Sequence, residues 1–233
     1  MKKNMPWLLC CLITGTVFLS AAHYGSRAIS VISENTPIPR KNCIIIDAGH
    51  GGEDGGAVSC TGLPESRYNL EIACRLNDLL HLIGHDTRMT RTEDISIYTK
   101  GESLSEKKIS DLKERAKIVN STENGILISI HQNNFSDSRY KGPQVFFSMN
   151  EQSRRLAKQM QSDLTDCLCP GSKRMSKKSS GIYLMDHIKT TGILIECGFL
   201  SNPEEEANLR SASYQKKLCC AITSSVSEFL SNT

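Results

Sequence analysis

Short apolar runs alternate with longer amphipathic segments through most of this chain, and this alternation limits the folds that it can adopt. The run CIIIDAGHGG (43–52) stops at a glycine cluster, as a buried strand does when it opens into a loop. After it, Leu70, Leu76 and Ile83 belong to a set of apolar residues at helical spacing. Further strands are predicted at 85–91, 125–131, 143–149 and 191–199, and helices at 65–83, 104–119, 153–168 and 214–230.

This order of elements predicts an α/β fold. Parallel strands that are covered on both faces are continuously apolar rather than alternating, and the predicted strands have that character. We therefore expect a single domain with a mostly parallel, twisted central sheet flanked by helices on both faces. A composition of 39% hydrophobic and 23% charged residues agrees with one ordinary globular domain.

The N-terminus has the composition of an export segment. Lys2 and Lys3 precede the uncharged run PWLLCCLITGTVFLSAA, which is close to the about 20 residues that span a bilayer. Residues 1–22 are therefore predicted to be either a cleaved signal peptide or a membrane anchor. Residues 23–41 contain two prolines and no sustained periodicity, which predicts a linker, so the catalytic domain is expected over 42–233. The domain would act outside the cytoplasm.

Three ionisable residues come at the ends of predicted buried strands. His50 follows IIIDAG, His131 follows LISI and Glu196 follows GILI. In open α/β sheets, ligands bind beyond the carboxyl ends of the strands. We therefore expect these three side chains to meet at one edge of the sheet.

The residue types at this edge indicate a zinc hydrolase. Two imidazoles and a carboxylate are the usual protein ligands of a catalytic zinc ion. Spacing leaves the carboxylate open, because Glu53 forms an HxxE with His50 while Glu65 opens the first predicted helix. Zinc lowers the pKa of water to about 7, and Glu196 is the candidate base for the water's proton. The sequence contains neither HExxH nor GxSxG, the best-known patterns of zinc proteases and serine hydrolases.

Four segments resemble, in their order, the motifs of the zinc-dependent N-acetylmuramoyl-L-alanine amidases: DAGHGGEDGGA, ESRYNLEIA, SIHQNN and ILIECGFLSNPEEEANL. The resemblance runs from about residue 42 to residue 230. It implies Zn²⁺ ligands at His50, Glu65 and His131 and a catalytic carboxylate at Glu196. It also implies the reaction, which is hydrolysis of the amide bond between N-acetylmuramic acid and the L-alanine of the peptidoglycan stem peptide.

Within that family, the segment GIYLMDHIKTTGILIECGFLSNPEEE is most similar to amidases of sporulation and germination, whose family role is muramic-lactam formation in the spore cortex. The similarity implies peptidoglycan as partner and an accessory protein for activation or targeting. It places the action at the outer face of the membrane, in the cell wall or in the forespore intermembrane space. A formal net charge of only +3 and the export segment argue against nucleic acid as a partner.

Four further polar residues are candidates for a role in or around the site. Arg91 and Arg115 are predicted either to bind a carboxylate of the stem peptide or to form salt bridges within the domain. Asp47 and Asn133 lie near the histidines in sequence and are predicted to hold them in place. Asn133 is also a candidate for substrate binding.

Two other functions are compatible with the same residues. A zinc carboxypeptidase or endopeptidase would use His50 and Glu53 and would cut within the stem peptide. A wall-binding protein with an inactive site would bind peptidoglycan without turnover. The products of digestion distinguish these alternatives from the amidase.

Overall fold

The structure, a computed structural model, describes residues 42–232. Its centre is a sheet of six strands in the order β2-β1-β3-β6-β4-β5. Four neighbouring strands, β2, β1, β3 and β6, are parallel, whereas β4 runs antiparallel to β6 and β5 follows the direction of β4. The strands are β1 (Cys43–Ala48), β2 (Asp86–Met89), β3 (Gly125–Asn133), β4 (Gln144–Phe147), β5 (Lys177–Lys178) and β6 (Thr191–Phe199). The predicted α/β fold with a mostly parallel sheet is confirmed.

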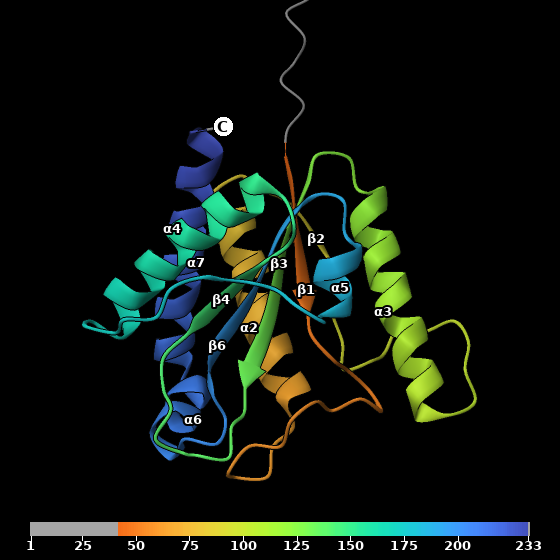
Figure 1. Cartoon of the computed structure of the whole chain (residues 1–233), viewed down its shortest axis with the longest axis horizontal. Coiled ribbons are helices and arrows are strands. Elements are labelled where there is room, and N and C mark those ends of the chain that lie inside the picture. Colours follow the sequence, from red (N-terminus) through yellow and green to blue (C-terminus); the bar gives the residue numbers. More distant parts are fainter. Residues whose placement is uncertain (1–41, 233) are drawn as a thin grey trace, which may run out of the picture. The chain divides into compact units, whose positions relative to one another are not determined.

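Helices cover both faces of the sheet, as predicted (Figure 1). One face carries α2 (Glu65–Leu82), α4 (Glu151–Leu168), α6 (Pro203–Arg210) and α7 (Ala212–Ser231), and the other carries α3 (Leu104–Ser121) and α5 (Tyr183–His187). Successive strand residues point to opposite faces. Ile44 and Ile46 therefore join the large core under α2 and α7, while Ile45 joins the smaller core under α3 and α5.

Three short elements and one strand direction were not predicted. β4 begins at the sheet edge where β3 ends, and no crossover helix lies between them, so β4 must run antiparallel. The short elements are β5, α5 and α6. A signal for α6 was present: Asn202 accepts hydrogen bonds from the amides of Glu204 and Glu205, and Pro203 occupies the first turn.

The predicted export segment (1–22) and linker (23–41) lie outside the described residues, so both stay predictions, as does the domain boundary at 42. Within residues 42–232, no helix has the length and apolar character needed to cross a membrane.

A buried ion pair joins the end of β1 to α3. Arg115 Nη1 lies 2.6 Å from Asp47 Oδ1, and the two side chains are 2% and 1% exposed. Ser129 and Thr90 donate hydroxyl hydrogen bonds to the same carboxylate at 2.6 and 2.8 Å. Burial alone would raise the pKa of Asp47, but Arg115 and Ser129 outweigh it and lower the pKa to about 2. Asp47 is therefore ionised at neutral pH.

Replacing Asp47 with alanine is expected to lower the free energy of unfolding by about 3 kcal/mol, because Arg115 would lose one of its two buried counter-charges. Arg115 keeps Asp111, whose Oδ2 lies 2.6 Å from its Nε, so the loss should stay near that value. Urea denaturation measures the change. Asp137→Ala is the control, because its ion pair with Arg139 is on the surface. Equal losses in the two variants would contradict the role given to Asp47.

Candidate metal centre

The chain turns sharply after β1, and this turn sets His50 against His131. His50 has a φ of +59°, in the left-handed region that side chains rarely adopt. Gly49 lies directly on the His131 imidazole, because a Cβ at position 49 would be 2.2 Å from His131 Nε2. The two imidazole rings are 5.0 Å apart between centroids and inclined at 75°. Glycine at position 49 thus permits the close approach of the rings.

Glu65 is the first residue of α2, and its buried carboxylate reaches both rings. The distance from Oε2 to His50 Nε2 is 3.3 Å, and that from Oε1 to His131 Nδ1 is 3.0 Å. Three further groups donate hydrogen bonds to the carboxylate: the amides of Ala57 and Gln132 and the side chain of Asn69. Burial would raise the pKa of Glu65, but the hydrogen bonds from the two histidines hold it well below its usual range. Glu65 is therefore an anion.

These three residues form a group that suits a divalent metal ion. One ligand atom from each of His50, Glu65 and His131 lies within 4.8 Å of the other two. Two imidazole nitrogens and one carboxylate oxygen are the protein ligand set of many catalytic zinc sites. The alternative ligand Glu53 lies elsewhere, since its side chain is 56% exposed and pairs with Lys107 at 2.9 Å. The structure thus brings Glu65, and not Glu53, to the two histidines.

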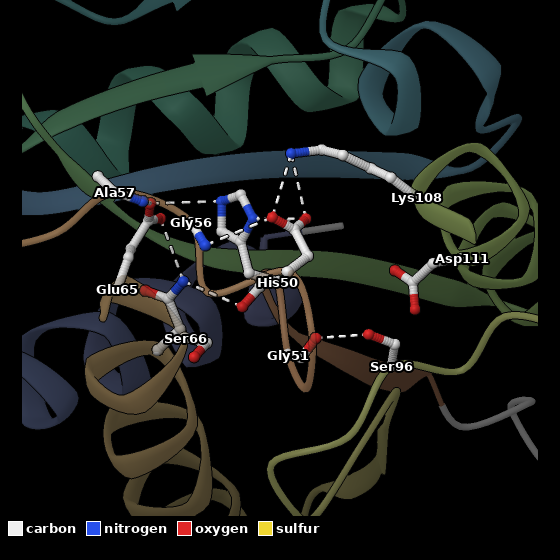
Figure 2. A network of polar contacts seen from close by, with 12 residues as sticks. His50, Gly51, Gly56, Ala57, Glu65, Ser66, Ser96, Lys108 and Asp111 are labelled. Atoms are coloured by element: carbon white, nitrogen blue, oxygen red, sulfur yellow. Dashed lines mark hydrogen bonds and ion pairs between the residues drawn. The ribbon is translucent and has the colours of Figure 1, made fainter. Parts of the chain in front are cut away.

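A carboxylate on the far side of His50 holds its ring. Asp54 Oδ2 lies 2.9 Å from His50 Nδ1, and Lys108 Nζ lies 3.1 Å from the same oxygen. Figure 2 shows the His50 imidazole between Glu65 and Lys108. Burial would lower the pKa of His50, but hydrogen bonds to Asp54 and Glu65 raise it to about 9. Asp54 thus directs Nε2 toward Glu65, the orientation that metal binding requires.

Sequence reasoning missed Asp54 and assigned this role to Asp47 and Asn133. Asp47 instead binds Arg115, Thr90 and Ser129. The segment HGGED offers two adjacent acids, and only the turn at His50 shows which one faces the ring.

Replacing Asp54 with asparagine is expected to weaken zinc binding by about 10- to 100-fold, as is usual when the hydrogen-bond partner of a ligand histidine changes. Competition with a chelator of known affinity measures the change. Glu53→Gln is a matched control, because within residues 42–232 the adjacent carboxylate pairs with Lys107 of α3 and not with His50. If both variants bound zinc as tightly as the unaltered protein, Asp54 would have no part in holding His50.

Glu196 stands beside His131 in the sheet. The two residues are paired in register between β3 and β6, so their side chains leave the same face. Glu196 Oε2 is enclosed and has no hydrogen-bond partner within residues 42–232. Burial raises the pKa of Glu196 to about 7, with Glu65 adding to the effect and the two histidines opposing it. Such a carboxyl group can take up and release a proton near neutral pH.

Comparisons with known proteins identify the family of this chain. The profile of the N-acetylmuramoyl-L-alanine amidase family matches residues 44–228. The chain belongs to this family. It is 35% identical to the germination-specific N-acetylmuramoyl-L-alanine amidase of Bacillus subtilis, over 95% of this chain and 93% of that protein.

Solved structures of amidases have the same fold. This amidase is similar to the CwlD amidase from Clostridioides difficile, determined in complex with the GerS lipoprotein, with a TM-score of 0.79 and 34% identity. That match covers 83% of this chain and 100% of the other. A second amidase, from Clostridium difficile 630, matches with a TM-score of 0.70 and 28% identity, over 83% of this chain and 98% of the other.

Two arginines of the amidase support the backbone around the centre. Arg91 is 3% exposed and Arg115 2% exposed. Their guanidinium groups donate hydrogen bonds to backbone carbonyls, with Arg91 reaching Ala48, Gly49, Ser66 and Glu93 and Arg115 reaching Ala48 and His50. This geometry favours the second interpretation given above, a role within the domain, over contact with a stem peptide. Asn133 is partly exposed, and its contact with substrate stays a prediction.

Buried residues of α2 and α6 fix the position of Glu65. Asn69, one turn after Glu65, also donates to the carbonyl of Gly49 at 3.1 Å. Tyr68 donates to Glu206 of α6 at 2.5 Å, and Thr61 of the preceding loop donates to the same oxygen at 2.6 Å. Asn69 could have been found from the sequence, because a residue four positions after Glu65 shares its helix face. Glu206 could not, because its contacts join segments about 140 residues apart.

Proposed function

We propose that this amidase uses Zn²⁺ to hydrolyse the bond between N-acetylmuramic acid and the L-alanine of the stem peptide in spore peptidoglycan. The observation that carries the proposal is the convergence of His50, Glu65 and His131 within 4.8 Å, with Glu196 in register beside His131. The family membership and the germination-specific relative support the reaction and its setting.

Each residue of the metal centre would have a distinct role. His50, Glu65 and His131 would hold the ion, and Asp54 would keep the His50 ring in place. A zinc ion supplies Lewis acidity, which polarises the scissile carbonyl and lowers the pKa of water to about 7. Glu196 would accept the proton of the attacking water and then donate it to the leaving amino group of L-alanine. Its raised pKa suits both transfers.

We infer that the enzyme is exported through residues 1–22 and acts on the wall side of the membrane, in the cell wall or the forespore intermembrane space. The cell-wall substrate of the family supports this location. An accessory protein for activation or targeting is part of the proposal, supported by the complex of the C. difficile CwlD amidase with a lipoprotein.

Digestion of purified peptidoglycan with the zinc-loaded protein tests the function. We expect mass spectrometry to identify released stem peptides with an L-alanine N-terminus and glycan strands that keep the lactyl group. Treatment with a chelator should stop the release, and added zinc should restore it. New ends within the stem peptide would support the carboxypeptidase or endopeptidase instead, and binding without products would support an inactive wall-binding protein.

A further inference from the structure

A β-bulge brings an aromatic residue to the face of Glu196. His131 pairs with Glu196, but Asn133 pairs with Phe199, so β6 has one extra residue between these pairs. Cys197 packs in the large core, and a side chain at Gly198 would lie 3.3 Å from Leu209 of α6. Both bulge residues therefore face α6 and α7, and Phe199 returns to the face that carries His131 and Glu196.

Phe199 begins a row of aromatic rings that leads out to solvent. Its ring is 6.1 Å from that of Tyr140, which is 4.9 Å from Phe135 in an edge-to-face arrangement. Phe199 is 3% exposed, whereas Tyr140 and Phe135 are 47% and 49% exposed. Both exposed rings lie on the loop between β3 and β4, and Phe135 is four residues beyond His131. We call Phe135 and Tyr140 the aromatic shelf.

The segment that follows β6 holds the loop of the shelf in place. Ser201 Oγ accepts a hydrogen bond from the amide of Phe135, and Asn202 donates to the carbonyls of Ser138 and Tyr140. Glu205 accepts from the amide of Gly142 at 2.7 Å. The loop is therefore tied to the turn after β6 and to the start of α6, and its exposed rings are held in position rather than packed away.

Of the charged side chains near the shelf, Arg139 and Arg174 are engaged, whereas Lys141 is exposed. Arg139 pairs with Asp137 at 2.7 Å. Arg174 lies over the Phe199 ring at 5.0 Å and donates to the carbonyl of Lys141. The shelf thus has the character of an apolar surface with polar neighbours, which suits an uncharged, hydroxyl-rich ligand better than a peptide carboxylate.

We propose that the aromatic shelf binds a sugar ring of the glycan strand next to the scissile bond. The proposal rests on the proposed function, in which the carbonyl that is attacked belongs to the lactyl group of a sugar. That sugar, or its neighbour in the strand, must lie close to Glu196. The apolar C–H face of a pyranose ring can pack on Phe135 and Tyr140, and exposed aromatic patches of this kind mark binding surfaces.

Binding of a soluble N-acetylglucosamine tetramer to the full-length protein tests the proposal without any turnover. The tetramer should bind the unaltered protein, and Phe135→Ala and Tyr140→Ala should each weaken binding by about tenfold, as for an anchoring aromatic side chain. Tyr140→Phe, which keeps the ring, should bind nearly as the unaltered protein does. Met149→Ala is the control, because Met149 is 69% exposed and follows the end of β4 at the opposite edge of the sheet. Melting temperatures of all variants establish that they fold.

Digestion of peptidoglycan by the same variants tests glycan binding by the shelf independently of the proposed amidase function. We expect the shelf variants to raise KM about tenfold with kcat changed less than about twofold, because the ring contacts the glycan and not the reacting atoms. No tetramer binding by the unaltered protein, or equal binding by the shelf variants and Met149→Ala, would overturn the proposal. So would variants that lose activity yet bind the tetramer normally, since the shelf would then affect the reaction in some way other than by holding the glycan. If the tetramer binds at the shelf but no peptides with an L-alanine N-terminus are released, the proposed amidase function is wrong, whereas glycan binding by the shelf is supported.

Discussion

Glu196→Gln is expected to lower the rate of amide hydrolysis by about 10²- to 10⁴-fold while zinc remains bound. The amide has the size of the carboxyl group but cannot carry a proton from water to the leaving amine. The loss should appear in kcat, because the proton transfers belong to the transition state and not to substrate binding. The release of peptides with an L-alanine N-terminus measures the rate of hydrolysis. The zinc content of the same samples shows whether the metal remains bound.

The control for this substitution is Glu204→Gln, which makes the same chemical change at an exposed carboxylate of α6. Its rate should equal that of the unaltered protein. A Glu196→Gln variant that hydrolyses peptidoglycan at the normal rate would remove this residue from the mechanism.

His131→Ala is expected to abolish both zinc binding and activity. Changes to the hydrogen-bond partners of metal ligands already cost about 10- to 100-fold in affinity, so loss of a ligand should cost more. Zinc should also cease to raise the melting temperature, because a ligand stabilises a folded protein only to the extent that it binds. Calorimetric titration and thermal unfolding with and without zinc measure the two effects.

His81→Ala provides the comparison for His131→Ala. His81 lies near the far end of α2, where its ring contacts Thr87 at 2.5 Å. This variant should bind zinc normally. Normal zinc binding by His131→Ala would mean that the metal is held by another set of residues.

Much of the fold could be predicted because burial on both faces imposes a continuous apolar pattern on parallel strands. β1, β3 and β6 each carry such a run, and a strand that ends at an ionisable residue places that residue at the sheet edge. The convergence of His50, His131 and Glu196 followed from this rule. The rule says nothing of the direction of β4, which depends on a loop of irregular structure between β3 and β4.

The finer parts of the site depend on geometry that spacing does not contain. From their positions in the sequence, Glu53 and Glu65 are equally good candidates for the third metal ligand. The packing of α2 on β3 decides between them, because it brings Glu65 to both histidines. Asp54 reaches His50 only because His50 adopts a left-handed backbone conformation. The bulge at 197–198 likewise places Phe199 on the same face of the sheet as Glu196, and no pattern in the sequence predicts this bulge.

Arg91 and Arg115 show a different limit of prediction from the sequence. Arg91 and Arg115 are charged, and a charged residue near a catalytic edge suggests contact with substrate. Both are almost fully buried and donate to carbonyl oxygens of the β1 turn, and Arg115 also pairs with Asp47 and Asp111. The backbone of that turn, left without strand partners, needs donors, and guanidinium groups with five N–H bonds supply them.

Anomalous diffraction at the zinc edge, from crystals of the zinc-loaded protein, tests the central claim most directly. We expect one strong peak about 2.0–2.2 Å from His50 Nε2, a Glu65 carboxylate oxygen and His131 Nδ1, with Glu196 nearby but outside the ligand set. A peak coordinated by Glu53, or one remote from both histidines, would contradict the account.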